Sequence, residues 1–165
     1  MTLFENLKWQ SHIDEITTKA SQRLYFIVLL KRAGIDPHHL INIYTSIVRS
    51  VLEYACQVWH TSLTKKQTRQ IEYIQRRAMR IIFQDKSYTE AITAANLPTL
   101  SDRREKLCRT LFISMQQSTH KLHHLLPPLR ETPYTTRNTR TYCVPRCRTA
   151  RFQNSFIPYA LRHWQ

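Results

Sequence analysis

The chain has 165 residues, 42% of them hydrophobic, and its 25 Lys and Arg against 11 Asp and Glu give a net charge of +14. This length suffices for one domain with a hydrophobic core and an appendage, and the hydrophobic content excludes a chain that is disordered by composition. The positive charge favours a polyanionic partner, most simply nucleic acid, because phosphates release counterions when they meet a basic surface.

The first predicted element is a helix from Trp9 to Ala33. Apolar side chains recur there at helical spacing, at Trp9, Ile13, Ile16, Ala20, Leu24, Ile27 and Leu30. Gly34 follows, where a helix would end, and it is the only glycine of the chain. Since so few positions are free to adopt positive φ, glycine-rich phosphate loops and tight hairpins are excluded. Helices joined by short loops remain.

The second predicted helix covers residues 36–59. Asp36 is placed to cap it, and Pro37 occupies the first helical position, where its missing N–H costs nothing. At about 100° per residue, the apolar side chains cover roughly half of the circumference. They are Leu40, Tyr44, Ile47, Val48, Val51, Leu52, Tyr54, Ala55, Val58 and Trp59, with Ser46, Arg49, Glu53, Cys56 and Gln57 on the other half. Such a wide stripe predicts a central helix that packs against several neighbours.

The third predicted helix covers residues 64–83 and has an apolar side and a cationic side. Thr64 and Gln67 have the spacing of a capping box, and Ile71, Ile74, Ala78, Ile81 and Ile82 form the apolar side. The other side carries Tyr73 and the candidate nucleic-acid-binding residues Lys65, Lys66, Arg69, Arg76, Arg77 and Arg80. The alternative is a solvated face, partly neutralised by Glu72, which has helical spacing to Arg69 and Arg76.

Two shorter helices are predicted next. Ser87 and Glu90 form a second capping box that opens a helix to Ala95, and Pro98 forces a break. Ser101 is predicted to cap a further helix to about Thr119, with Leu107, Leu111 and Met115 on one face and Arg103, Arg104, Lys106 and Arg109 mostly off it. The prediction is an all-α bundle of about five helices in residues 1–120.

Residues 121–165 are predicted to form an extended, basic C-terminal arm that contains proline. Pro127, Pro128, Pro133, Pro145 and Pro158 exclude a long core helix, although the last dozen residues can form one short amphipathic segment. The arm holds five further candidate nucleic-acid-binding residues, Arg137, Arg140, Arg146, Arg148 and Arg151. They are interleaved with Tyr134, Tyr142 and Phe152, a mixture suited to neutralising phosphates and stacking on single strands. A disordered tail is the alternative.

Catalysis and metal binding have little support in the sequence. The four Asp residues are at positions 14, 36, 85 and 102, so no carboxylate cluster can hold catalytic ions. Cys56 and His60 are one helical turn apart, as a nucleophile and base could be, but a packed thiol and a helix-end histidine explain them much better. His120, His123 and His124 with Cys143 and Cys147 only half meet the spacing of a zinc site. We expect no enzyme activity, no metal and no cofactor.

Targeting signals are also lacking in the sequence. No run of about 18 uncharged apolar residues occurs, which predicts no membrane span. The first six residues do not have the pattern of a signal peptide. We therefore expect an intracellular protein, nuclear or cytoplasmic, in which Cys56, Cys108, Cys143 and Cys147 are thiols.

Several motifs resemble the region that follows the polymerase palm in reverse transcriptases of LINE-type, non-LTR retrotransposons. They include Leu7-Lys8-Trp9-x-x-His12-Ile13, Ser50-Val51-Leu52-Glu53-Tyr54-Ala55-Cys56-x-Val58-Trp59 and Ile71-Glu72-x-Ile74-Gln75-Arg76-Arg77-Ala78. Further matches are Leu97-Pro98-x-Leu100-x-x-Arg103-Arg104, Leu125-Leu126-Pro127 and Arg148-Thr149-x-Arg151-Phe152-x-x-Ser155-Phe156-Ile157-Pro158-x-Ala160. Gln57 departs from the family, where many members have Pro before the Val-Trp pair.

The resemblance implies a thumb that grips a template–primer duplex, RNA–DNA hybrid or other, by its backbone and without sequence specificity. It also implies that the palm and its paired catalytic aspartates are absent, so that the chain would be a non-catalytic fragment of an RNA-directed DNA polymerase. The alternative is a structural remnant that packs on an absent palm and has no activity of its own.

Overall fold

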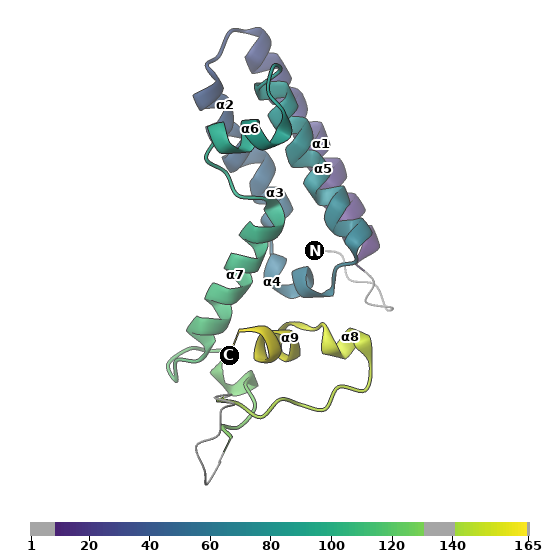
Figure 1. The fold of residues 1–165 in the computed structure, drawn as a ribbon, viewed down its shortest axis with the longest axis vertical. Coiled ribbons are helices and arrows are strands. Elements are labelled where there is room, and N and C mark those ends of the chain that lie inside the picture. Colours follow the sequence, from purple (N-terminus) through teal and green to yellow (C-terminus); the bar gives the residue numbers. More distant parts are fainter. Residues whose placement is uncertain (1–8, 131–140, 165) are drawn as a thin grey trace. The chain divides into compact units, whose positions relative to one another are not determined.

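The computed structural model describes residues 9–130 and 141–164 (Figure 1). In these two ranges the regular structure is helical, with no strand and one isolated β-bridge between Leu129 and Tyr142. The predicted all-α class is therefore confirmed. None of the described helices is both long and apolar enough to cross a bilayer.

The helices follow one another in the order α1 Gln10–Arg32, α2 Pro37–Ile43, the π-helix η1 Tyr44–Arg49, α3 Ser50–Glu53, α4 Cys56–Trp59, the 3₁₀-helix η2 His60–Ser62, α5 Lys65–Ile82, α6 Tyr88–Ala94, α7 Leu100–Met115, the 3₁₀-helix η3 His123–Leu125, α8 Ala150–Gln153 and α9 Phe156–His163.

The described residues divide by their contacts into two compact units. The N-terminal unit contains the residues up to Cys56 together with Leu63–Arg104, and the C-terminal unit contains Gln57–Ser62 together with the residues from Glu105 onwards. The division at residue 120 that the sequence suggested stays a prediction.

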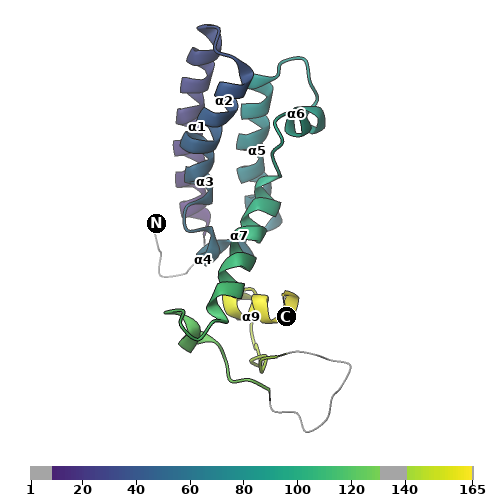
Figure 2. The same cartoon turned by 90° about the vertical axis from the view of Figure 1, so that its left-hand side faces the viewer.

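Three helical rods form the core of the N-terminal unit, and α1 and α5 run parallel. Gln10 at the start of α1 bonds Gln70 near the start of α5, and Lys31 at the end of α1 bonds Ile81 and Ile82 at the end of α5. The rod formed by α2, η1 and α3 runs in the opposite direction (Figure 2), and Arg23 of α1 donates to the carbonyl of Ile47 in this rod. Buried side chains fill the space between the rods, among them Ile13, Ala20, Leu24, Ile27, Leu40, Tyr44, Val48, Leu52, Ile71, Ala78 and Met79.

The predicted first helix is confirmed, and Gly34 ends it as expected. Gly34 has φ +80°, its N–H donates to Lys31 O at 3.0 Å, and the N–H of Ile35 donates to Leu30 O at 3.1 Å. This is a Schellman motif, in which a residue of positive φ lets the chain satisfy the last carbonyls of a helix. Asn96, at φ 50°, ends α6 with the same pattern of two hydrogen bonds. Asn is the residue that most readily replaces Gly there.

The prediction of one regular α-helix over residues 36–59 is wrong. Asp36 caps α2 as expected, accepting from His38 N at 2.8 Å, but the helix continues as a π-helix over Tyr44–Arg49. It ends at Tyr54, before Ala55 adopts φ 51°. The fully buried residues are spaced by four: Leu40, Tyr44, Val48, Leu52 and Cys56. On an ideal α-helix, each step of four residues goes about 40° beyond a full turn, so the side chains at the two ends of this series would point about 160° apart. A π-helix has more residues per turn, which keeps the series closer to one side of the helix.

The wide apolar stripe predicted for residues 36–59 was a consequence of projecting them on an ideal α-helix. Ile47, Tyr54 and Val58, which the projection assigned to that stripe, are exposed, whereas Cys56, which it assigned to the polar half, is buried.

The later helices differ from prediction mainly where α7 begins. α6 has the predicted capping box of Ser87 and Glu90. In α7 the capping side chain is that of Thr99, which accepts from Asp102 N at 3.1 Å, so Ser101 lies inside the helix and the capping prediction for it was wrong. Glu72 of α5 explains this shift, because its carboxylate accepts from Ser101 N at 2.6 Å and Leu100 N at 3.3 Å.

The C-terminal unit has a core of its own. Phe112, Tyr142, Ala160 and Leu161 are buried there, and Leu126, Val144, Phe156, Ile157 and Trp164 pack against them. The indole N–H of Trp164 donates to Glu105 Oε1 at 2.8 Å. An extended arm is thus not confirmed, since α8, α9 and Tyr142 lie in the segment for which it was predicted.

Candidate nucleic-acid interface

The six predicted cationic residues of α5 lie on one exposed face of the helix. The capping box of Thr64 and Gln67 is present, so α5 begins at Lys65 as predicted. At about 100° per residue, the six cations and Tyr73 fall within an arc of about 120°. All seven side chains are exposed, while Ile71, Ile74, Ala78 and Ile82 on the opposite side are buried. We call the exposed set, Lys65, Lys66, Arg69, Arg76, Arg77 and Arg80, the cationic face.

The only acidic residue of α5, Glu72, does not neutralise this face. Its Oε1 lies 3.8 Å from Nη2 of Arg104, whose side chain is fully buried, and its carboxylate accepts from the first N–H groups of α7. The predicted pairing of Glu72 with Arg69 or Arg76 is therefore wrong. Among the described residues, no ion pair includes a member of the cationic face.

Two arginines of the cationic face contact tyrosine rings. The guanidinium carbon of Arg76 lies 4.9 Å from the centre of the Tyr88 ring, and that of Arg77 lies 6.0 Å from the centre of the Tyr73 ring. Burial raises the pKa of the Tyr88 hydroxyl, so this ring is neutral at physiological pH. Such contacts hold the guanidinium groups in place without neutralising them.

A groove at the end of α5 adds two cations that the sequence analysis missed. Its volume is about 540 Å³, and it is lined by Val28, Lys31, Arg32, Arg80, Ile81 and Gln84. Lys31 donates from Nζ to the carbonyls of Ile81 and Ile82, at 2.5 and 3.0 Å, and so caps α5. The signal available in the sequence was the Lys31-Arg32 pair at the end of the predicted first helix, but only the parallel packing of α1 and α5 places it beside Arg80.

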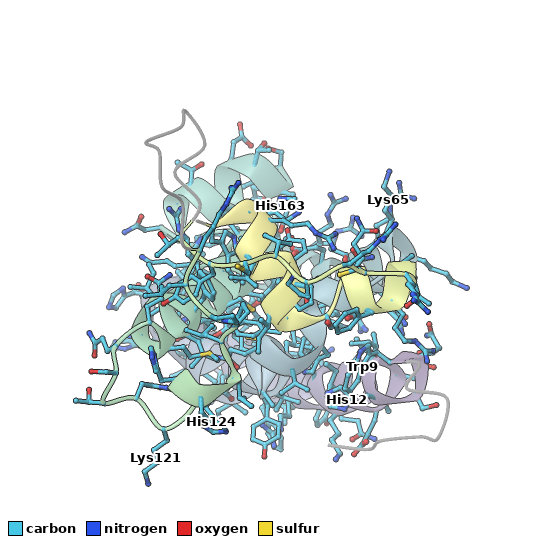
Figure 3. The ribbon with its side chains drawn as sticks, turned by 90° about the horizontal axis from the view of Figure 1, so that it is seen from below. Trp9, His12, Lys65, Lys121, His124 and His163 are labelled. Carbon is cyan, nitrogen blue, oxygen red and sulfur yellow. The ribbon has the colours of Figure 1, made fainter. Side chains whose placement is uncertain are left out.

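The start of α5 carries Lys65 and Lys66, where a helix disfavours positive charge. The first N–H groups of a helix give that end a partial positive charge. Figure 3 labels Lys65, whose side chain extends away from the ribbon. Since both lysines are exposed, their charge is available to an external anion.

The arginines predicted in the C-terminal arm are not brought together with the cationic face by any described contact. Arg146, Arg148 and Arg151 are exposed in the C-terminal unit, with Arg151 in α8. Arg137 and Arg140 lie outside the described residues. A role for these five arginines in nucleic-acid binding stays a prediction.

The histidines and cysteines considered as metal ligands are separately engaged. Nδ1 of His120 accepts from Leu122 N at 3.1 Å, His123 Nδ1 donates to Met115 O at 3.0 Å, and His124 Nδ1 donates to Lys121 O at 2.9 Å. Cys143 and Cys147 are free thiols, as are the buried Cys56 and Cys108. In the described part of the chain, no three His, Cys, Asp or Glu side chains are grouped as a metal site requires.

The other histidines with notable surroundings are also structural. Nε2 of His60 lies 3.1 Å from Glu105 Oε2, within the C-terminal unit. His12 is buried in α1, and its ring meets that of Trp9 edge-on at 6.2 Å between centres (Figure 3). Burial lowers the pKa of His12, which favours its neutral form.

One family model matches the chain. It is described as "Alkylated DNA repair protein alkB homolog 8, N-terminal", and it matches residues 9–50, about a quarter of the chain. These residues form α1, α2 and η1, which are one of the three rods of the N-terminal unit and most of a second. Searches of the curated proteins and of the solved structures found no match to this chain.

This match corrects the resemblance to LINE-type reverse transcriptases. The family that matches is a different one, so the assignment to a retrotransposon was wrong. The polymerase parent and the absent palm as a partner have no support from this match. Several residues that carried the resemblance have a simpler explanation in the fold, because Leu52, Trp59, Ile71, Ile74 and Ala78 are buried core residues. Apolar residues at these spacings are what a helical core requires. The match to this family model covers α1, α2 and η1.

Proposed function

We propose that the protein binds double-stranded nucleic acid through its phosphate backbone, without reading the sequence, and that the cationic face of α5 is the contact surface. The single observation that carries this proposal is the grouping of six exposed, unneutralised cations within about a third of one helix circumference. The proposed function is binding alone and involves no reaction.

A solvated face explains this arrangement less well than a binding surface does, because the arrangement costs stability. Lys65 and Lys66 oppose the dipole at the start of α5, at about 0.3–1 kcal/mol each. Like charges four residues apart, as in Lys65 with Arg69 and Arg76 with Arg80, cost about 0.2–0.5 kcal/mol per pair. An anion that lies along α5 would offset both costs.

The dimensions of the cationic face suit a duplex. Lys65 and Arg80 are separated by about 22 Å along the helix axis. That length of a duplex carries roughly a dozen phosphates on its two strands, so each cation can meet one. Gln70, the amide side chain bordering the face, is engaged by Asp14 at 2.7 Å and Thr17 at 3.2 Å. Because Gln70 is held in this way, contacts to phosphate rather than to base edges are expected.

The description of the matching family supports the same class of partner. That description names repair of alkylated DNA, and the segment that matches supplies α1, against which α5 packs. We therefore infer that a basic helix on this scaffold serves contact with nucleic acid.

The test is a titration of the full chain with a fluorescent duplex of about 20 base pairs at salt concentrations from about 50 to 200 mM. Anisotropy should show binding that weakens as salt rises. A plot of log K for binding against log salt concentration has a negative slope, to which each phosphate contact contributes about 0.9. In the triple variant Arg69→Gln, Arg76→Gln and Arg80→Gln, this slope should be less negative by about 2.7. Duplex DNA and an RNA–DNA hybrid of one sequence should both bind.

The matched control is a triple variant with the same change of net charge elsewhere, Lys106→Gln, Arg109→Gln and Arg130→Gln, all of which are exposed. Its salt dependence should stay close to that of the parent chain. If the parent chain does not bind at low salt, or if both triple variants lose affinity equally, the cationic face is not the contact surface.

Charge reversal at the two ends of α5 separates binding from folding. Lys65→Glu places a favourable charge at the start of the helix and should stabilise the protein by about 0.3–1 kcal/mol, whereas Arg80→Glu should destabilise it by a similar amount. Both changes should weaken duplex binding. If affinity instead follows stability, rising in Lys65→Glu, the proposal fails.

A further inference from the structure

The C-terminal unit contains an apolar groove with a volume of about 600 Å³. Its lining residues come from α7, from the segments before and after it, and from α8 and α9: Gln57, Val58, Leu111, Met115, Leu122, Leu125, Pro127, Pro145, Phe152, Ser155, Phe156, Ile157 and Pro158. Among the lining residues, only Gln57 and Ser155 are polar. We call this surface the apolar groove.

Large side chains of the apolar groove are left open to solvent. Val58 is 49% exposed, Leu125 is 49% exposed and Phe152 is 47% exposed. Beneath them the unit has a closed core of Phe112, Ala160 and Leu161, which are fully buried. The exposed groups are therefore not needed to complete that core. A partner that covers them would remove apolar area from water, which favours binding by roughly 25 cal/mol for each Å² buried.

The C-terminal unit, which contains the apolar groove, is strongly basic in composition. From Glu105 to the end of the chain, Glu105 and Glu131 are the only acidic residues. Glu105 is engaged by His60 and by the indole of Trp164. Cations adjoin the groove along the chain: Lys121 precedes Leu122, Arg146 follows Pro145, and Arg151 precedes Phe152.

We propose that the apolar groove binds an acidic, amphipathic segment of a partner protein, with its apolar side chains in the groove and its carboxylates toward the surrounding cations. A helix with apolar residues at positions i, i+3 or i+4 and i+7 is the form that suits a groove of this kind. We expect carboxylates on the partner because nearly all charges of the C-terminal unit are positive, and an acidic segment complements them.

Two other occupants fit the observations less well. A second copy of this chain carries the same charge of +14 and would bring like charges together. A nucleic acid strand needs cations and stacking rings inside its site, whereas the apolar groove is lined mainly by aliphatic side chains, with Phe152 and Phe156 as its only aromatic ones. Both occupants are outcomes that the test can detect.

The probe is a fluorescent peptide of about 16 residues with Leu at the helical spacing above and Glu at its other positions. Two control peptides have the same Leu and Glu residues in scrambled order, or Lys in place of every Glu. The full chain should bind the probe about tenfold more tightly than either control. Its affinity for the probe should fall as salt rises, because the carboxylates meet cations.

Variants then locate the site. Val58→Glu and Leu125→Glu should each weaken probe binding by about tenfold. The matched control is Ile113→Glu, because Ile113 is 54% exposed on α7 and does not line the groove. It should change the affinity by less than about twofold. The triple Gln variant of the cationic face should bind the probe as the parent chain does, which separates this proposal from the proposed function.

A second measurement needs no variant. A probe with a photoreactive Leu analogue should cross-link to residues of the apolar groove. Equal binding of the scrambled peptide or cross-links elsewhere would overturn the proposal. So would displacement of the probe by a single-stranded oligonucleotide, or self-association of the chain that Val58→Glu abolishes, since these identify a nucleic acid or a second copy as the occupant.

Discussion

The residue with the most consequential hydrogen bonds in the N-terminal core is Gln75. Its side chain is fully buried; Oε1 accepts from the Tyr44 hydroxyl at 2.8 Å, and Nε2 donates to Pro98 O at 3.0 Å and to the Tyr88 hydroxyl at 3.4 Å. Burial raises the pKa of the Tyr44 hydroxyl, so it remains a donor. One amide thus joins η1, α5 and the segment before α7.

Replacing Gln75 by Leu should destabilise the protein by about 1–3 kcal/mol, because the Tyr44 hydroxyl and the Pro98 carbonyl lose their partner while buried. Tyr44→Phe alone should cost about 1 kcal/mol. Urea unfolding followed by circular dichroism measures both changes. The double variant should lose less than the sum of the two single losses, whereas strict additivity would show that the two side chains do not interact.

The sequence predicted the role of single residues where that role depends on neighbours a few positions away in the chain. It did not predict the role where it depends on residues far away in the chain. The caps of Asp36, Thr64 and Ser87 follow from three or four adjacent residues, and all three are present. The burial of Gln75 and Arg104 depends on contacts of α5 with α6 and with the first turns of α7, which no local pattern shows. Arg104 was predicted to lie off the apolar face, yet it is fully buried.

At the scale of the element, Glu72 of α5 determines where α7 begins. Its carboxylate caps the first N–H groups of α7 and is the counterion of Arg104 in the same helix. The helix dipole favours an anion at this position, and the buried guanidinium requires one. The boundary of α7 is consequently set by a residue 28 positions before it.

Replacing Glu72 by Ala should destabilise the protein by about 3–5 kcal/mol, because it removes the carboxylate that lies 3.8 Å from the buried guanidinium of Arg104. The double variant Glu72→Ala, Arg104→Met should recover part of that loss. Thermal and urea unfolding measure both.

The control is Glu15→Ala, which removes the exposed ion pair with Lys19 and should cost less than about 1 kcal/mol. Equal losses in Glu72→Ala and Glu15→Ala would contradict a structural role for the buried pair.

The segment of residues 36–59 shows why the shape of an element was harder to predict than its type. Its helical character follows from the cap at Asp36 and the apolar residues. The π-helix and the positive φ of Ala55 are not encoded by glycine or proline. For a residue with a Cβ, a left-handed conformation costs about 1–2 kcal/mol and persists only when tertiary packing requires it.

At the scale of the whole molecule, the charge of +14 opposes compactness. Self-repulsion destabilises a folded state whose net charge is far from zero, and salt screens that repulsion. The all-α class could be predicted because helical periodicity is local. The division into two units could not, because it depends on contacts of α7 and of residues 57–62 with segments far along the chain.

Raising the salt concentration from about 50 to 300 mM should therefore increase the melting temperature by a few degrees, since about 1 kcal/mol corresponds to roughly 2–4 °C at this size. The triple variant Arg69→Gln, Arg76→Gln and Arg80→Gln should melt at a higher temperature at low salt and show a smaller increase. A melting temperature that falls with salt would mean that attractive ion pairs outweigh the repulsion.

The attachment of α5 at both of its ends has one more consequence. Near the start, Gln67 and Gln70 bond Gln10 at 3.3 Å each, and near the end Lys31 holds the carbonyls of Ile81 and Ile82. These hydrogen bonds oppose rotation of α5 about its axis and sliding along α1, so the spacing of its charges is set by folding. A ligand that meets this row of charges need not order the backbone first, and the entropy that a flexible basic tail would lose on binding has already been lost during folding.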